Sequence, residues 1–205
     1  MVRHSVEKTI LSLLKTGRNK SASDLQGILV NSISQVTSKD LLEPQINYYM
    51  NHCFLWLKEF FSIFNLEKYI PIYGPTKPRI TLGKTPVEFR VSAVLRSKKT
   101  QTLHVLLFTP GATKHYMKND PIALLAIRAY QNLVKEHKQS KRPQVIVHCF
   151  GYGKNDNLNY YTVNSNQFDQ NKINKLTYLI NAMEIGLHYP VLPCLHKCKF
   201  KKDCY

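Results

Sequence analysis

Apolar residues recur at helical spacing in the first forty residues. Between residues 2 and 15 every third or fourth position is apolar and Gly17 follows, so we predict an amphipathic helix that ends there. Ser23 and Gln26 have the spacing of a capping box. This predicts a second helix whose apolar face carries Leu25, Ile28, Leu29 and Ile33. Helices of this kind serve either as packing elements or as a docking surface for a partner.

Residues 41–66 predict a longer helix that is rich in aromatic side chains. These are Tyr48, Tyr49, Phe54, Trp56, Phe60, Phe61 and Phe64. We interpret them as core packing rather than as a platform for nucleic-acid bases, because buried aromatic side chains dominate the packing energy of protein cores. Cys53 lies in the middle of this helix, where a single cysteine usually packs as a small apolar residue.

The rest of the chain alternates between predicted strands and helices. After a break from Pro71 to Pro78, we predict strands at residues 79–82, 87–96 and 102–108, the last two joined as a hairpin. A helix follows from Pro121 to about residue 138, with an inner face of Ile122, Leu125, Ala129 and Leu133. The last predicted elements are strands at 144–152 and 159–163 and a helix at 172–185. This order predicts an α/β (α+β) fold in which helices flank a mixed sheet.

Charge adds an expectation about partners. The chain has 29 Lys and Arg against 13 Asp and Glu, a formal net charge of +16. Such an excess points to an anionic partner, and nucleic acid, DNA rather than RNA, is the first candidate; an acidic protein is the alternative. No apolar run approaches the roughly 18 residues of a membrane span, so we expect a cytoplasmic protein. Frequent Asn and Lys suggest a phage or a low-GC bacterium.

The five cysteines are unevenly distributed. Three of them, Cys194, Cys198 and Cys204, fall in the last twelve residues, where lysines fill the gaps between them. An odd number of cysteines in an intracellular chain disfavours a disulfide framework, and clustered thiols in that setting more often bind a metal. So short and charged a tail cannot bury a core of its own, which makes a metal centre the natural way to hold it.

The layout resembles the RecB-like branch of the PD-(D/E)XK nucleases, and in particular its members with a four-cysteine iron–sulfur cluster. The likeness lies in residues 46–54 around Cys53, in residues 186–194, and in the C-x3-C-x5-C tail. It covers residues 41–205, so we expect a restriction-endonuclease-like domain there and an N-terminal helical extension at residues 1–40. The tail has one residue more in its first gap than is usual for the family.

The resemblance implies the ligand set of the metal centre. In these nucleases one cysteine precedes the core and three follow its last helix, which corresponds here to Cys53, Cys194, Cys198 and Cys204. Thiolates are soft ligands for iron–sulfur clusters and for zinc. We expect a structural 4Fe–4S cluster, with zinc as the alternative, because the one-plus-three arrangement is less typical of zinc ribbons. Cys149, in an apolar strand, is expected only to pack.

The residues of a nuclease centre are missing at the positions where the resemblance expects them. Ser92, Leu107 and Thr109 stand where the family has two acids and a lysine, and Ile122 and Ala126 replace a Gln-x-x-x-Tyr motif. Between Arg79 and Lys118 the one acidic residue is Glu88, whereas a Mg²⁺ site for phosphodiester cleavage usually needs at least two oxygen ligands. We therefore predict an inactive nuclease fold; an active enzyme with a migrated site is the alternative.

Basic side chains could still hold nucleic acid through its phosphates. The candidate contacts are Arg90, Arg96, Lys98, Lys99, Lys114, Lys118, Lys197, Lys199, Lys201 and Lys202. The resulting hypothesis is a nucleic-acid-binding pseudo-nuclease that works as a subunit of a larger nucleic-acid-processing complex. The competing hypothesis is a structural or inhibitory subunit with no direct nucleic-acid role, which binds a protein through its N-terminal helices.

Overall fold

A computed structural model of the chain describes residues 2–16, 26–31, 43–100, 102–109, 121–135, 144–152, 158–167 and 170–184. The chain divides into two compact units. The first consists of Met1–Pro78 with Phe89–Phe168, and the second of Arg79–Glu88 with Asp169–Tyr205. Helix α1 lies in the same unit as the sheet, and the predicted boundary at residue 40 stays a prediction.

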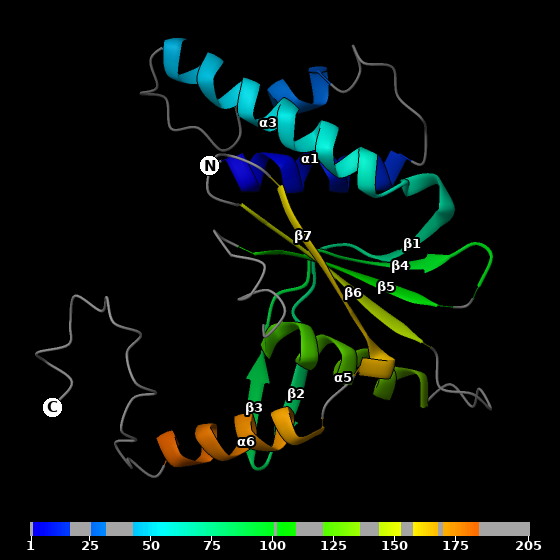
Figure 1. The fold of residues 1–205 in the computed structure, drawn as a ribbon, viewed down its shortest axis with the longest axis vertical. Helices are drawn as coiled ribbons and strands as arrows, with labels where there is room; N and C mark the ends of the chain where they lie inside the picture. The colour runs from blue at the N-terminus through cyan, green and yellow to red at the C-terminus, as the bar shows by residue number, and fades with distance from the viewer. Residues whose placement is uncertain are drawn as a thin grey trace, which may run out of the picture. The chain divides into compact units, whose positions relative to one another are not determined.

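The sheet of the first unit is mixed and has five strands in the order β1-β4-β5-β6-β7 (Figure 1). Their bounds are Tyr69–Tyr73, Ala93–Ser97, Leu103–Thr109, Val145–Tyr152 and Leu158–Asn164. β5 and β6 are parallel, and the other neighbours are antiparallel. The helix between β5 and β6 supplies the crossover that a parallel pair requires. The mixed sheet with flanking helices confirms the coarse fold class predicted from the sequence.

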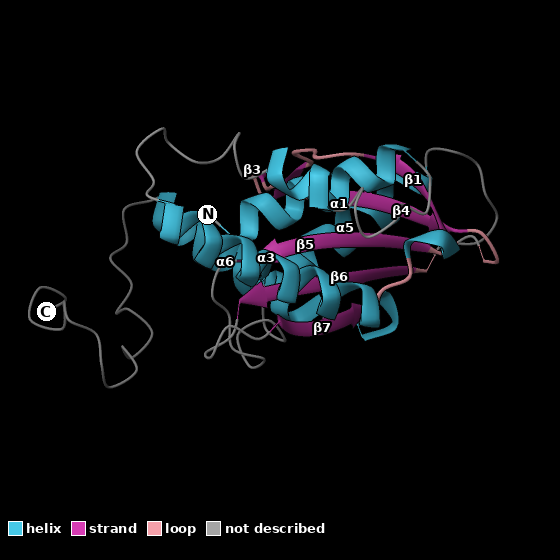
Figure 2. Ribbon diagram, turned by 90° about the horizontal axis from the view of Figure 1, so that it is seen from above, coloured by secondary structure: helices cyan, strands magenta, loops and turns pink. Residues whose placement is uncertain are grey.

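Two helices cover one face of this sheet (Figure 2). α1 spans Val2–Thr16 and α3 spans Glu43–Ile63, close to the predicted ranges. In α3 the buried positions Cys53, Trp56, Leu57 and Phe60 follow the helical repeat and form one stripe. α1 packs against α3 through buried apolar residues, among them Val6 and Ile10, so α1 is a packing element. The predicted second helix appears at residues 26–31, with Leu29 buried.

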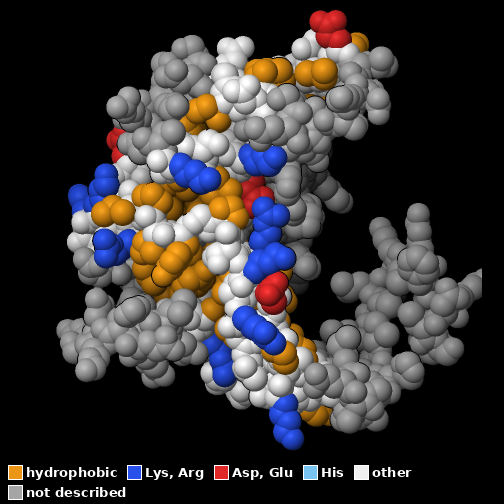
Figure 3. All heavy atoms as spheres, turned by 180° about the vertical axis from the view of Figure 1, so that it is seen from behind, with side chains coloured by type: hydrophobic (Ala, Val, Ile, Leu, Met, Phe, Trp, Pro, Cys, Tyr) orange, Lys and Arg blue, Asp and Glu red, His pale blue; other side chains and the backbone are white. Residues whose placement is uncertain are grey.

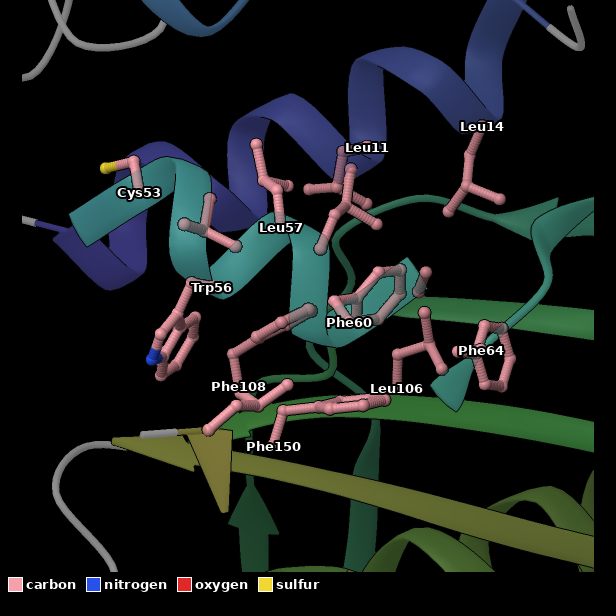
Figure 4. Packing of buried hydrophobic residues seen from close by; sticks show 14 of the residues in the cluster. Leu11, Leu14, Cys53, Trp56, Leu57, Phe60, Phe64, Leu106, Phe108 and Phe150 are labelled. Atoms are coloured by element: carbon pink, nitrogen blue, oxygen red, sulfur yellow. The ribbon is translucent and has the colours of Figure 1, made fainter. Parts of the chain in front are cut away.

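The core between α3 and the sheet is largely aromatic (Figure 4). Phe60 of α3 meets Phe108 of β5 and Phe150 of β6, with ring centroids 4.9 Å apart for Phe60 and Phe150, and Phe64, just after the helix, also meets Phe150. Because side chains alternate along a strand, Leu106, Phe108 and Phe150 share this face while their neighbours face the other way. The predicted interpretation of the aromatic stripe as core packing is confirmed for Trp56, Phe60 and Phe64.

The opposite face of the sheet is covered by α5, which spans Pro121–Lys135 and packs mainly over β6. Pro121 occupies the first helical position, where its missing N–H has no partner to lose. Ala123, Ile127 and Tyr130, spaced four and three residues apart, are buried. The predicted inner face is wrong at Ile122, which is exposed, because the buried stripe starts one position later.

β1, Tyr69–Tyr73, runs into the break that we predicted from Pro71 to Pro78, so that prediction is wrong for residues 71–73. Pro71 is tolerated because β1 is an edge strand. Ile70 pairs with Arg96 of β4, and Pro71 pairs with Leu95. The missing N–H of Pro71 is tolerated because this position makes no hydrogen bond to β4. A register shift between Pro71 and Tyr73 then ends the regular pairing.

The predicted strand 87–96 is two strands that belong to different units. β3, Thr85–Glu88, pairs with β2, Arg79–Leu82, as a separate hairpin, and β4 begins at Ala93. In the second unit α6 spans Gln170–Glu184 and contributes buried Ile173. The hairpin turns at Gly83, whose φ of +64° suits glycine, and a Cβ there would lie 2.9 Å from Asn181 of α6.

Candidate metal centre and nucleic-acid surface

Cys53 is the predicted metal ligand whose surroundings the structure describes. It lies in the buried stripe of α3 and is 1% exposed. Figure 4 shows its sulfur at the end of this stripe, pointing away from Phe60 and Phe150. Burial raises the pKa of the Cys53 thiol to about 12. Because the thiolate is the ligand, a metal bound here would have to displace the thiol proton.

The other three predicted ligands, Cys194, Cys198 and Cys204, lie outside the described residues. Within the described ranges, no three His, Cys, Asp or Glu side chains lie close enough together to hold a metal ion. The Cys53 thiol is a soft ligand of the kind that iron–sulfur clusters and zinc take, and it is buried in the protein interior. The four-cysteine centre therefore stays a prediction.

Cys149 lies on the other side of the sheet from Cys53. It is fully buried in β6, next to Phe150, and the two side chains alternate between faces. Phe150 belongs to the same core cluster as Cys53, so Cys149 points toward the α5 side. This geometry keeps Cys149 out of a centre built around Cys53 and agrees with a packing role.

The positions that correspond to a nuclease centre come together on the β4–β5 hairpin. The Ser92 amide donates to the Leu106 carbonyl at 3.0 Å, immediately before the pairing of Ala93 with Leu106. Ser92 and Leu107 are therefore neighbours across the two strands, and both are buried. Thr109 ends β5, two residues further on. No carboxylate occupies any of these three positions.

Two of the described acidic side chains make hydrogen bonds at separate places in the first unit. Glu7 of α1 accepts from Arg90 at 3.1 Å, and Glu59 of α3 accepts from the Leu158 amide at 2.6 Å. Glu88 lies in β3 of the second unit, whereas Ser92 and β5 belong to the first. Its suggested partner Asp120 lies outside the described residues. Among the described residues, Glu7, Glu59 and Glu88 are not part of any group of three or more His, Cys, Asp or Glu side chains that could hold a metal ion.

The predicted basic contacts divide into three groups. Arg90 forms an ion pair with Glu7 of α1, so its side chain has a structural role. Arg96, Lys98 and Lys99 are exposed at the distal end of the β4–β5 hairpin. The others, Lys114, Lys118, Lys197, Lys199, Lys201 and Lys202, lie outside the described residues.

The turn that carries Lys98 and Lys99 is braced by hydrogen bonds. The Ser97 hydroxyl accepts from the amides of Lys99 and Thr100, at 3.3 and 3.2 Å. The Lys98 amide donates to the Lys68 carbonyl, which ties the turn to the start of β1. A fixed turn with two exposed lysines presents positive charge at a defined place, as phosphate contacts require.

A buried polar network, which sequence reasoning missed, crosses the sheet beneath α3. His104 Nδ1 of β5 lies 2.8 Å from His148 Nε2 of β6, and His148 Nδ1 lies 2.8 Å from the Tyr160 hydroxyl of β7. Phe64 packs edge-on against His148, and Tyr69 packs against His104. The available signal was the position of His148 inside a run of apolar residues in its strand.

Burial makes both histidines poor bases. It lowers the pKa of His104 to about 4, and it lowers the pKa of His148 to about 3, with His104 as a second cause. Burial also raises the pKa of Tyr160 to about 12. All three groups are therefore neutral near pH 7. An efficient general base has a pKa near the working pH, so these shifted pKa values favour a structural role for the network.

No protein-family model and no curated protein matches the chain. Among solved structures, the chain is similar to SSO0001, known from a crystal structure, with 16% sequence identity and a TM-score of 0.26. The match covers 87% of this chain and 74% of that one. So low a TM-score supports no conclusion about fold or function.

In the described part of the chain, no helix is both long enough and apolar enough to cross a membrane.

Proposed function

We propose that the protein is a catalytically silent member of the RecB-like PD-(D/E)XK nuclease group that binds nucleic acid through a basic surface. In this proposal it works as a subunit of a larger nucleic-acid-processing complex. Cys53, Cys194, Cys198 and Cys204 hold a 4Fe–4S cluster, which fastens the C-terminal tail to α3. The cluster supplies a structural cross-link across about 140 residues, and closing so long a loop restricts the unfolded chain.

The β4–β5 hairpin is the observation that carries this proposal. One end places Ser92 beside Leu107, where the resemblance expects carboxylates, and both side chains are buried. The other end presents Arg96, Lys98 and Lys99 to solvent. These two features support a protein that binds a phosphodiester without cleaving it. The order of helix, three antiparallel strands, helix and parallel strand also agrees with the resemblance.

The metal content of the protein tests the cluster. Anaerobically purified protein should be brown and contain about four iron and four sulfide per chain, because four thiolates match a 4Fe–4S cluster. Visible absorption with iron, sulfide and zinc assays on one sample measures this. Cys53→Ser should abolish the colour, whereas Cys149→Ser, on the opposite face of the sheet, should retain it. A colourless, metal-free protein that is folded would remove the cluster from the proposal.

Salt dependence tests nucleic-acid binding. The protein should bind a labelled DNA oligonucleotide with an affinity that falls steeply with salt, and fluorescence anisotropy measures it. Replacing Lys98 and Lys99 with alanine should lower the slope of log K against log salt by about one for each phosphate that these lysines neutralise. Replacing Lys172 and Lys175 of α6, which are also exposed, removes the same charge at another place and serves as the control.

The same samples should not cut single- or double-stranded DNA with Mg²⁺ or Mn²⁺. Cleavage that disappears in Glu88→Ala would replace the silent-subunit proposal with an active enzyme. Equal slopes for the two lysine pairs would show that the hairpin turn does not bind the phosphates.

A further inference from the structure

β1 presents an apolar surface that the fold itself leaves open. Ile70 is 40% exposed, Ile72 is 38% exposed and Tyr73 is 53% exposed, three large apolar side chains within four residues. Figure 3 shows hydrophobic side chains gathered on one face of the molecule, with Lys and Arg at their borders. Single exposed apolar residues are ordinary, but a contiguous group rimmed by polar ones marks an interaction site.

The backbone edge of β1 is closed to an added strand. Strand addition needs free N–H and C=O groups along the outer edge. The Tyr69 amide already donates to the Leu66 carbonyl, and Pro71 has no N–H to offer. Proline on an edge strand is a common protection against edge-to-edge pairing. The surface is therefore suited to contact through side chains rather than through backbone pairing.

The exposed side chain of Ile70 lies on the side of the sheet that carries α5. Ile70 pairs with Arg96, so their side chains point to the same face of the sheet, opposite to Leu95 in the α3 core. That face is the one α5 covers, and α5 packs mainly over β6, with further contacts to β5 and β7. A helix laid over β1 would extend the helical layer there.

The charge around this surface is mostly positive. Residues 67–78 and 88–100 contain six basic residues, Lys68, Lys77, Arg90, Arg96, Lys98 and Lys99, against two acidic ones, Glu67 and Glu88. Lys68, Arg96, Lys98 and Lys99 are exposed at the end of β1. A second copy of this chain, at +16, would bring like charges together. A partner that complements this positive charge is acidic.

The side chains of Ile70 and Ile72 favour an acidic protein over nucleic acid as the partner at this surface. Nucleic acids use basic groups for their phosphates and aromatic rings for their bases, and branched aliphatic side chains offer no stacking surface. Two isoleucines beside one tyrosine match the apolar side chains of a protein segment instead.

We propose that Ile70, Ile72 and Tyr73, with Arg96, Lys98 and Lys99 at their border, form a docking surface for an acidic amphipathic helix of a partner protein. The apolar side of the partner helix covers β1, and its carboxylates face the basic border. The inference does not depend on the metal centre, but it uses the same basic side chains as the proposed phosphate contacts, so the partner helix and nucleic acid would compete for Arg96, Lys98 and Lys99. It places the partner on β1 rather than on α1, whose apolar residues are buried in the core.

A pair of synthetic helical peptides, ~15 residues or four turns long, tests this surface. One carries leucine at every third or fourth position and glutamate at most others; the second has serine in place of each leucine. The full-length protein should bind the leucine peptide about tenfold more tightly than the serine peptide, measured by fluorescence anisotropy. The double variant Ile70→Ser/Ile72→Ser should lose about tenfold in affinity for the leucine peptide. Leu55→Ser, at an exposed leucine of α3, should retain it.

The variants keep every lysine and arginine, so an oligonucleotide titration of the same proteins separates the two kinds of partner. Unchanged oligonucleotide binding by the isoleucine variant, with weakened peptide binding, supports a protein surface. Loss of oligonucleotide binding with unchanged peptide binding would overturn the inference in favour of nucleic acid at β1. Equal binding of the two peptides would also overturn it, because only charge would then be recognised. Circular dichroism confirms that each variant is folded.

Discussion

Replacing Phe60 with alanine is expected to lower the free energy of unfolding by about 3–5 kcal/mol, the usual cost of a large-to-small change in a core. The Phe60 side chain is fully buried. Its ring lies 4.9 Å from that of Phe150 and 6.2 Å from that of Phe108, so it connects α3 to β5 and β6. Alanine would leave a cavity between the helix and the sheet. Urea denaturation followed by circular dichroism measures the change.

A leucine on the same helix provides the control. Leu55 is 53% exposed, so Leu55→Ala should change the free energy of unfolding by less than about 0.5 kcal/mol. A domain is stable by only about 5–15 kcal/mol, so Phe60→Ala could leave the chain unfolded. Phe60→Leu, which retains much of the volume, then keeps the comparison measurable with a smaller loss. Equal stability of the Phe60 and Leu55 variants would contradict the packing of α3 on the sheet.

The helices and the central strands could be predicted because their patterns are local. In α3 the buried residues repeat with the helical period, and in β5 and β6 runs of branched and aromatic residues mark buried strands. Pro121 predicted the start of α5. These signals follow from which face of an element is buried, and each can be found without knowing what packs against it.

β1 and the division of residues 87–96 could not be predicted because their causes lie elsewhere in the chain. Pro71 predicts a break, yet at an edge strand its missing N–H has no consequence. Val87, Phe89 and Val91 alternate as one strand would, and no glycine or proline separates β3 from β4. Only the pairing of β3 with β2, and of β4 with β5, distinguishes the two strands.

The candidate sites also contain some features that local sequence patterns predict and others that depend on distant parts of the chain. The burial of Cys53 follows from its position in the helical stripe, and the exposed lysines follow from a polar turn. The partnership of Arg90 with Glu7 joins residues 83 positions apart, and that of His104 with His148 joins residues 44 apart. Contacts over such distances depend on strand order and register, which one sequence does not reveal.

The histidine pair makes the fold sensitive to acid. Both folded-state pKa values, about 4 for His104 and about 3 for His148, lie below the ordinary value of 6.5. The unfolded chain therefore binds protons first as the pH falls. The stability contributed by the neutral pair is fully present above about pH 6.5 and is lost progressively toward pH 4. Each unit of difference corresponds to about 1.4 kcal/mol, so we expect a loss of about 3 kcal/mol or more by pH 4.

The surroundings of the pair explain why protonation is so unfavourable. The neutral rings can share one proton in each of their two hydrogen bonds, His104 with His148 and His148 with Tyr160. If both rings were protonated, two N–H groups would face each other across 2.8 Å. The aromatic rings of Phe64 and Tyr69 pack against the pair, and neither supplies a negative charge near neutral pH. Burial therefore makes protonation of the first histidine unfavourable. Repulsion between the two charged rings makes protonation of the second one more unfavourable still.

Unfolding measured by urea between pH 7.5 and pH 4.5 should show a steep loss of stability for the natural protein. His148→Gln should start from a lower stability at pH 7.5, because it disturbs two buried hydrogen bonds, yet lose less on acidification because one buried titrating group is gone. His52→Gln, at a histidine of α3 outside the network, should lose as much as the natural protein. The His148 variant and the natural protein should therefore converge as the pH falls. Parallel curves for the two proteins would mean that groups other than the His104–His148 pair set the acid limit of the fold.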